Sequence, residues 1–189
     1  MINDFYEETF KGIDFTKKSI VKGEYDNCTF VDCNFDSIHA SNIQFIECEF
    51  INCNFSNTIV KNTAFKDVIF TECKLIGVKF NECDQFLLAF QFNKCQLNLA
   101  SFYQLKLQNI KFSDCSMEEV DFTEANISKG LFEDCNLKQA IFDNTNLEKS
   151  DFRSSYNFDI NPSINLIKGA KFSQLNVQGL LKSFQIIVE

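Results

Sequence analysis

The sequence lacks several features that would assign it to a common class of protein. Its apolar runs are far shorter than the roughly 18 residues of a transmembrane helix. Its first residues, Met-Ile-Asn-Asp-Phe-Tyr-Glu-Glu, contain neither the basic nor the apolar stretch of a secretory signal. We therefore expect a cytoplasmic protein that does not enter a membrane. Tryptophan is absent and proline occurs once, whereas phenylalanine occurs 23 times and takes over the usual core role of Leu, Ile and Val.

Residues for metal binding and catalysis are also scarce. His39 is the single histidine, so the nine cysteines have no histidine set with which to form a mixed zinc site. The sequence contains no Gly-rich phosphate loop, no G-x-S-x-G motif and no H-E-x-x-H motif. We predict that the protein is not an enzyme and binds no cofactor and no metal.

Positive charge is in deficit, since the formal net charge is -8. A protein that binds nucleic acid directly needs a basic surface. The charge therefore argues against direct nucleic-acid binding. It fits a basic protein partner or, as is more common, a surface that is acidic for solubility.

The most informative feature is a period of five residues, which belongs to neither an amphipathic helix nor a simple strand. The stretch from Phe45 to Phe55 reads F-I-E-C-E-F-I-N-C-N-F, with a large apolar residue at every fifth position. We call these large residues the centres. They run from Phe5 to Phe80, slip by two residues within 81–86, and resume from Leu87 to Phe152.

A second inward position lies two residues before each centre and holds a small side chain. We interpret each quintet as one large and one small inward side chain, with three positions facing water, which fills a narrow interior without voids. The thiols are then core residues in a reducing compartment rather than disulfides. Cys83 lies inside the slip and keeps the earlier register. The other cysteines occupy this inward position, and they are Cys28, Cys33, Cys48, Cys53, Cys73, Cys95, Cys115 and Cys135.

Asn or Asp often occupies the position immediately before a centre. These side chains suit turns, where they bond to neighbouring backbone, so we predict a structural role at the corners of a coil. The residues concerned are Asn34, Asn54, Asn136, Asn146, Asp121 and Asp151.

A longer period of twenty residues is superimposed on the period of five. Phe10, Phe30, Phe50 and Phe70 are twenty apart, and Phe92, Phe112, Phe132 and Phe152 continue the column after the slip. Residues twenty apart should therefore stack, with four faces to each lap. The sequence predicts a solenoid of square cross-section whose slip is a small bulge on the wall.

The units C-T-F, C-N-F, A-N-I, C-N-L and T-N-L, each followed by two further residues, resemble the pentapeptide-repeat family over residues 5–152. That family repeats a small residue, Asp or Asn, Leu or Phe, and two variable residues. The resemblance implies an all-β fold, a right-handed quadrilateral β-helix. We divide the chain into a β-helix at 1–152, with the slip at 81–86, and a tail at 153–189 containing a last irregular coil and a C-terminal cap.

The tail is rich in apolar residues. Their spacing at 177–184 predicts a short amphipathic helix, and 186–188 reads as a short strand. The tail either caps the open end of the coil or joins two copies. The resemblance favours a homodimer, because topoisomerase-protecting members pair through their C-termini. The predicted contact residues are Val177, Leu180, Leu181, Phe184, Ile186 and Ile187.

Two rows biased to negative charge follow two neighbouring faces, and they carry the candidate partner-binding residues. Stacked like charges repel, so the rows are unfavourable unless they meet something basic. They are either a solvated acidic surface or an imitation of DNA, which proteins bind largely through phosphates. The candidates are Asp32, Glu47, Asp67, Glu72, Asp114 and Asp134.

The resemblance is to the gyrase-protecting members of the family, the Qnr, MfpA and McbG kinds, and the terminal motif G-L-L-K-S-F-Q-I-I-V is similar to theirs. It implies a DNA-mimicking protein that binds DNA gyrase or topoisomerase IV and modulates or protects it against quinolones or toxins. The Qnr kind carry long loops that this chain lacks, which places drug protection in doubt. The alternative is a structural or regulatory interaction module with a different partner.

Overall fold

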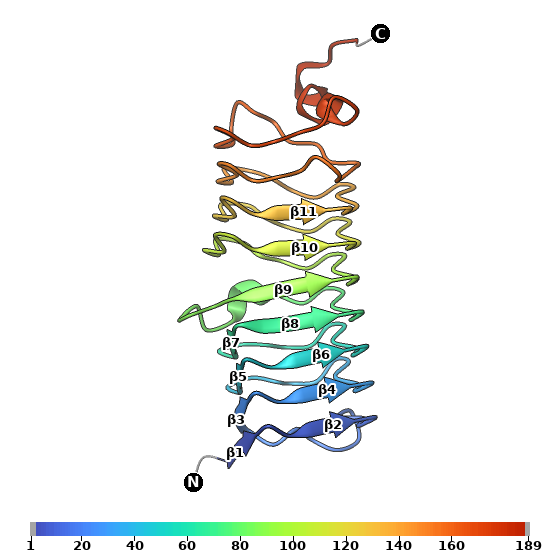
Figure 1. Cartoon of the computed structure of the whole chain (residues 1–189), viewed down its shortest axis with the longest axis vertical. Coiled ribbons are helices and arrows are strands. Elements are labelled where there is room, and N and C mark those ends of the chain that lie inside the picture. The colour runs from blue at the N-terminus through green and yellow to red at the C-terminus, as the bar shows by residue number, and fades with distance from the viewer. Residues whose placement is uncertain (1–2, 188–189) are drawn as a thin grey trace.

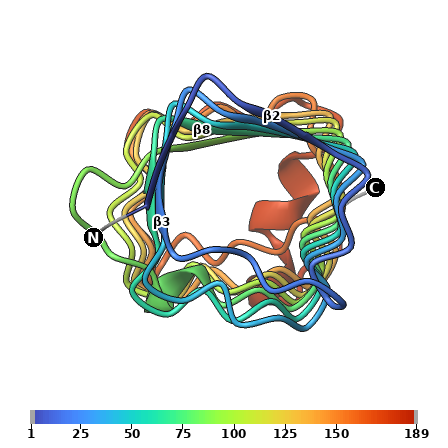
Figure 2. The same cartoon turned by 90° about the horizontal axis from the view of Figure 1, so that it is seen from below.

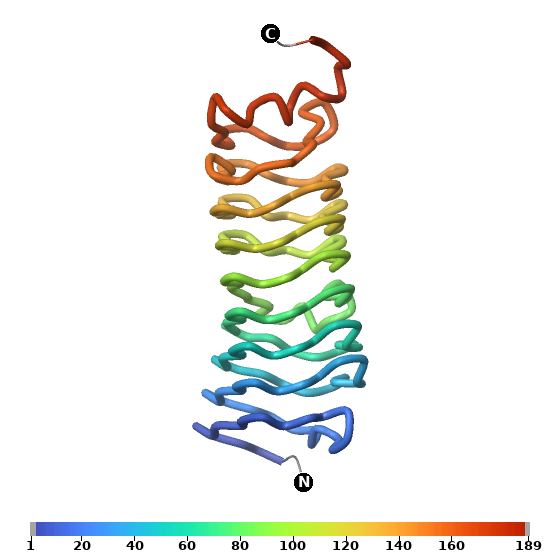
Figure 3. The backbone as a smooth tube through the Cα atoms, turned by 90° about the vertical axis from the view of Figure 1, so that its right-hand side faces the viewer, coloured from blue at the N-terminus to red at the C-terminus, as the bar shows by residue number. Residues whose placement is uncertain are grey.

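The computed structural model describes residues 3–187 and shows a straight, four-sided coil of stacked laps with the chain ends at opposite ends of the rod (Figures 1 and 3). Viewed from the N-terminal end, the chain runs clockwise as it recedes, so the coil is right-handed (Figure 2). The predicted all-β, right-handed, four-sided β-helix is confirmed. None of the helices within 3–187 is long and apolar enough to cross a bilayer.

Two of the four faces are parallel β-sheets. One has the strand order β1-β3-β5-β7 and the other β11-β10-β9-β8-β6-β4-β2. Paired residues are twenty apart, as in Phe10 and Phe30, except where Phe70 pairs with Phe92. The strands are β1 Asn3–Tyr6, β2 Thr9–Lys11, β3 Gly23–Asp26, β4 Thr29–Val31, β5 Gln44–Ile46, β6 Glu49–Ile51, β7 Ala64–Lys66, β8 Val68–Thr71, β9 Phe90–Asn93, β10 Lys111–Ser113 and β11 Leu131–Glu133.

The other two faces are held by single parallel bridges between laps. Asn34 bridges to Asn54 on the third face, and Asp121 bridges to Ile141 on the fourth. A short 3-10 helix, η1 Phe80–Glu82, lies on the fourth face. The twenty-residue period read from the sequence is therefore the length of one lap.

Phenylalanine rings fill the centre of the rod. Along the second face, successive rings are stacked with centroids between 4.5 and 5.4 Å apart. This offset stacking, one ring per lap, matches the spacing of hydrogen-bonded strands. The stacked column is Phe10, Phe30, Phe50, Phe70, Phe92, Phe112, Phe132, Phe152 and Phe172.

The small inward residues bond to the backbone as well as filling space. The thiol of Cys73 donates to the carbonyl oxygen of Phe50 in the preceding lap at 3.3 Å. The Thr58 hydroxyl donates to Phe35 in the same way at 2.6 Å, and the Ser155 hydroxyl donates to Phe132 at 2.7 Å. Where the small inward residue carries a donor, it therefore bonds to a buried carbonyl oxygen, whereas Ala100, Ala125 and Ala140 only fill the space.

The predicted structural role of the Asn and Asp residues before the centres is confirmed. Each accepts a hydrogen bond from the backbone N–H two residues later, as Asn34 does from Asp36 at 3.1 Å and Asp121 from Thr123 at 2.9 Å. Asn54, Asn136, Asn146 and Asp151 do the same. These bonds hold the chain at the edge of each face.

The two extra residues lie later than predicted. Ala64 still bridges to Asp84, and Phe90 already pairs with Val68, so the insertion falls within 85–89. The expected centre at Leu87 was wrong, because its side chain is 65% exposed and Phe90 is buried instead. Phe86 is also exposed, and the segment projects from the wall as a loop between β8 and β9 (Figure 1).

The last irregular coil, 153–172, completes one more lap. Phe172 stacks on Phe152 with centroids 5.4 Å apart, and Tyr156, Leu166 and Lys171 bridge to the lap below. Beyond it lie two 3-10 helices, η2 Val177–Leu180 and η3 Lys182–Phe184, in place of the single amphipathic helix expected. The strand predicted at 186–188 is not formed at 186–187, and Val188 lies outside the described residues.

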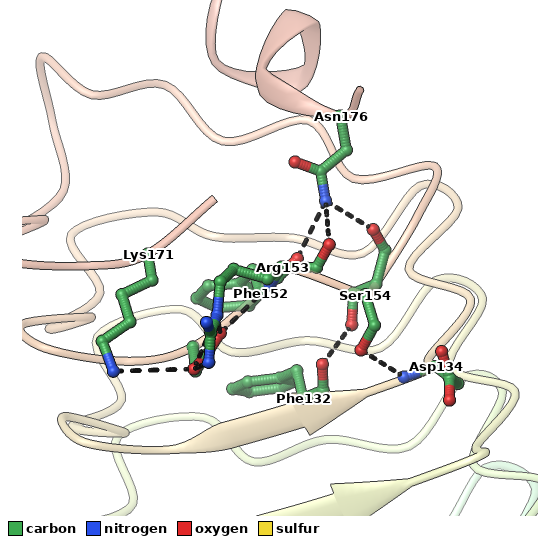
Figure 4. Close-up of polar contacts among 9 residues, drawn as sticks. Phe132, Asp134, Phe152, Arg153, Ser154, Lys171 and Asn176 are labelled. Carbon is green, nitrogen blue, oxygen red and sulfur yellow. Dashed lines mark hydrogen bonds and ion pairs between the residues drawn. The ribbon is translucent and has the colours of Figure 1, made fainter. Parts of the chain in front are cut away.

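Asn176 fastens this tail to the open end of the coil. Its amide nitrogen donates to the carbonyl oxygens of Phe152, Arg153 and Ser155 at 2.9, 3.3 and 2.8 Å (Figure 4). Gly179 lies directly against the Phe158 ring, where a Cβ atom would come within 2.3 Å of a ring carbon. The tail therefore covers the exposed carbonyls and apolar interior of the final lap.

Candidate partner-binding surface

The candidate acidic residues lie at the corners of the coil, where the backbone is left-handed. The residue two after a centre has a positive φ in almost every quintet, for example 50° at Glu47 and 55° at Asp114. Its N–H donates to the next lap, as Glu47 does to Lys66 at 2.8 Å. The backbone thus directs each corner side chain outward, and all six candidates are exposed.

The corner between the β1 sheet and the β2 sheet is here named the first edge. From the N-terminal end its left-handed residues are Glu7, Asn27, Glu47, Asp67, Leu87, Asn109, Lys129, Lys149 and Gly169, of which Leu87 lies in the inserted loop. Three of the first four are acidic, Leu87 is apolar, and two of the four beyond the loop are lysines. Sequence reasoning recognised the acidic part and missed the lysines, although they keep the same twenty-residue register.

Neighbouring side chains strengthen the acidic half of the first edge. Asp26 and Glu49 lie beside Asn27 and Glu47, and no acid of this half forms an ion pair within residues 3–187. The pKa of Tyr6 is raised by its hydrogen bond with Glu7 and then by the negative charges of Glu7, Asp26 and Glu47. Carboxylates from successive laps therefore act together at one place.

The second edge, between the β2 sheet and the third face, is more mixed. Asp32 accepts a hydrogen bond from the Asn52 amide at 2.8 Å, and Glu72 lies 3.7 Å from the Lys94 ammonium. Asp114 and Asp134 follow on successive laps beyond Lys94. The structure thus brings Glu47 and Asp67 together on one edge, and it separates Asp32 and Glu72 from Asp114 and Asp134 by a lysine.

The left-handed backbone accounts for part of this composition. Asn and Asp tolerate positive φ better than other residues with a Cβ atom, so their presence at corners has a conformational reason. Glutamate has no such preference. The negative charge at Glu7 and Glu47 is therefore not explained by backbone geometry.

The predicted dimerisation residues divide into two groups. Leu180 packs against the core and Leu181 is half-buried, so both help to seat the tail. Phe184, Ile186 and Ile187 are 51%, 57% and 87% exposed, and Val177 is also exposed. Leu175, which sequence reasoning omitted, is 95% exposed. The C-terminal end thus presents a set of apolar side chains to solvent.

The cysteines are buried and free. Burial raises the pKa of the Cys48 thiol to about 12, so this side chain is a neutral donor rather than a thiolate. Within residues 3–187, no group of three or more His, Cys, Asp and Glu side chains is arranged to hold a metal ion. His39 is exposed on the fourth face.

Comparison with known proteins gives both a family and a fold. A family model described as pentapeptide repeat region matches residues 23–91 and 87–158. A trypsin-treated variant of QnrB1, a plasmid-mediated fluoroquinolone resistance protein, superposes with a TM-score of 0.64 at 15% identity, covering 99% of this chain and 100% of that one.

Two further structures are less similar. Full-length QnrB1 gives a TM-score of 0.41 at 16% identity, covering 97% of this chain and 100% of that one. HetL from Nostoc sp. strain PCC 7120, involved in heterocyst differentiation regulation, gives 0.39 at 11% identity over 89% of this chain and 86% of its own. A search of curated protein sequences returned no match. The match of the family model, which extends over most of the coil, means that this chain is a member of the pentapeptide-repeat family.

Proposed function

We propose that this protein is a DNA-mimicking binding protein whose partner is DNA gyrase or topoisomerase IV, and that it acts in the cytoplasm by modulating or protecting that enzyme. The observation that carries the proposal is the acidic half of the first edge. There, the carboxylates of Glu7, Glu47 and Asp67, which form no ion pair within 3–187, recur along a straight rod. The presence of the same fold in a fluoroquinolone resistance protein supports the choice of partner.

The mechanism is competition for a basic surface. A topoisomerase holds duplex DNA largely through contacts to phosphates, which are negative charges at regular intervals. Carboxylates on successive laps of the rod offer negative charge about every 4.8 Å along its axis. The acidic edge would occupy the DNA-binding groove and reduce the access of DNA to it.

The test is supercoiling by purified gyrase with this protein titrated in, with and without a quinolone, alongside a binding measurement over a range of salt concentrations. Reversing Glu7, Glu47 and Asp67 to Lys should weaken binding by roughly 30- to 100-fold, since each exposed pair contributes up to about 1 kcal/mol and reversal adds repulsion. Glu119→Lys with Glu124→Lys is the control, because both residues are exposed left-handed corners on other edges. Absence of binding and of any effect on supercoiling at large molar excess would exclude the proposal.

A homodimer through the C-terminal tail forms part of this proposal. The exposed apolar side chains at Leu175, Phe184, Ile186 and Ile187 exceed what a cap over one lap requires. Pairing two rods end to end through their C-termini would place one acidic half at each far end of the assembly. Phe184→Asp with Ile187→Asp should remove the end-to-end contact, so that light scattering gives a smaller assembly than the unaltered chain, while leaving the Asn176 anchor in place.

A second candidate is an interaction module with a partner other than a topoisomerase. The observation that favours it is the loop at 85–88, whose Phe86 and Leu87 side chains are 68% and 65% exposed. An apolar tip of this kind recognises shape rather than charge. Binding of such a partner would survive reversal of the acidic edge and would fall on Phe86→Ser.

A further inference from the structure

We propose that the first edge is a self-complementary surface on which a second copy of this chain binds side by side and antiparallel. This inference concerns a face of the rod different from the C-terminal end, and it does not depend on the identity of the topoisomerase. It rests on the order of charges along the edge, on the place of the loop within that order, and on the hollow beside the loop.

The edge is divided into equal halves by the loop. Counting corners outward from Leu87, four laps lead back to Glu7 and four lead forward to Gly169. A two-fold axis through the loop therefore places each lap of one half opposite a lap of the other half in the second copy. This is the condition for an isologous contact, in which residue i meets residue j and j meets i.

The corner charges on the two halves are opposite in sign where they occur, although Lys66 adjoins Asp67 in the acidic half and Glu148 and Asp151 adjoin Lys149 in the other. Asp67 is matched with the Asn109 lap, whose neighbour is Lys111, and Glu47 is matched with Lys129. The Asn27 lap, with Asp26, faces Lys149. The Glu7 lap faces Gly169, beside Lys168 and beside Lys171, whose ammonium group also lies 3.7 Å from Asp151 of its own chain. Each of the four matched laps therefore offers a lysine at or near its corner.

Apolar side chains occupy the place where the two-fold axis would pass. Phe86 and Leu87 project there, and the ammonium group of Lys66 lies 6.0 Å from the centre of the Phe86 ring. A hollow of about 250 Å³ opens beside the loop, lined by Asp67, residues 88–91 and residues 106–111. Each copy thus offers an apolar tip and an adjoining hollow at the centre of the contact, surrounded by charge pairs, the usual arrangement of a binding hot spot.

The pair has a consequence for any other partner of the acidic half. Glu47 and Asp67 cannot face the lysines of a second copy and a basic partner at the same time. The lateral pair is therefore a state in which the acidic edge is covered, and dissociation of the pair exposes it.

Charge-reversal variants provide the test. The acid-reversed variant carries Glu47→Lys and Asp67→Lys, and the base-reversed variant carries Lys111→Glu and Lys129→Glu. Each variant alone places like charges on both halves, so its self-association should weaken by at least about 100-fold relative to the unaltered chain. An equimolar mixture of the two variants restores opposite charges on both halves, and we expect it to form a heterodimer close to the unaltered pair in affinity.

The measurement is sedimentation velocity of the full chain and its variants at about 50 mM and about 500 mM salt, since charge pairing at an exposed edge is screened at high salt. Phe86→Ser should weaken the pair at both salt concentrations. Glu119→Lys with Glu124→Lys should leave it unchanged, and circular dichroism confirms that each variant keeps its fold. Because the proposed C-terminal contact would persist in every charge variant, each variant is also measured together with Phe184→Asp and Ile187→Asp. Failure of the mixed variants to associate in that background, or loss of all dimer with Phe184→Asp and Ile187→Asp alone, would overturn the inference.

Discussion

The role of the inward thiols can be tested at Cys73, whose sulfur has three backbone partners. It donates to the carbonyl oxygens of Phe50 and Thr71 at 3.3 and 3.4 Å, and it accepts from the Cys53 N–H at 3.3 Å. Cys73→Val keeps the apolar volume and leaves these backbone groups without the sulfur as a partner. An unsatisfied buried group costs about 1–3 kcal/mol, so we expect Cys73→Val to lose about 2–4 kcal/mol of unfolding free energy.

Cys73→Ser retains both a donor and an acceptor at the same position. It loses mainly the burial of a large, polarizable atom, and we expect a change of about 1 kcal/mol. The serine variant should therefore be the more stable of the two. Ser155 and Ser150 already make the corresponding hydroxyl bonds in later laps, to Phe132 and Ile127, which shows that the geometry accepts an oxygen donor.

Cys83 is the matched control. It is buried at the same inward position, and no hydrogen bond joins its sulfur to any other residue of 3–187. At this position the valine variant should be the more stable of the two, because Cys83→Ser buries a hydroxyl without a partner and Cys83→Val does not. Urea unfolding followed by far-UV circular dichroism gives all four free energies. A Cys73→Val variant as stable as Cys73→Ser would refute the hydrogen-bonding account and leave volume alone as the reason for cysteine.

Three further predictions concern the core, the cap and pH. Phe112→Ala removes one ring from the middle of the stacked column, so urea unfolding should show a loss of about 3–5 kcal/mol; a loss below about 1 kcal/mol would mean that the rings do not carry the core. Asn176→Ala frees three carbonyls and should speed amide hydrogen exchange in the final lap while leaving exchange near Phe50 unchanged. Burial raises the pKa values of Cys48 and Tyr25 to about 12, so the folded state holds protons that the unfolded state releases from about pH 9 upward. Stability should therefore fall as pH rises through 9 to 12, by up to about 1.4 kcal/mol per pH unit for each group, and a urea midpoint that is constant from about pH 8 to about pH 10.5 would contradict this.

The sequence predicted the coil because its signal is repeated many times. One Phe in a column says little, whereas Phe10, Phe30 and Phe50 with Cys33 and Cys53 in phase admit only a twenty-residue lap. The location of the slip was less certain because Phe86, Leu87, Leu88 and Phe90 are all apolar. Several registers place a large residue inside, and only the pairing of Phe90 with Val68 decides among them.

The surface was predicted less well than the interior. The spacing at 177–184 fits an amphipathic helix, but the structure has two short 3-10 helices there. They accompany the close contact of Gly179 with the Phe158 ring and the hydrogen bonds of Asn176 to the final lap. The pairing of Glu72 with Lys94 depends on which long side chains meet across laps, and a period alone does not determine this. The left-handed corners also went unrecognised, because residues as different as Glu47, Leu99 and Lys129 adopt them.

The constant lap makes the length of this protein adjustable in discrete steps. Outside the longer lap that contains the loop, removing or duplicating twenty residues from one corner to the equivalent corner of the next lap rejoins strands in the same register. The rod then becomes shorter or longer by about 4.8 Å. Such an edit leaves the composition of each wall intact, yet it shifts every feature beyond it relative to those before it. The distance along the rod from the loop at 85–88 to either end can therefore be changed by whole laps without redesigning the core.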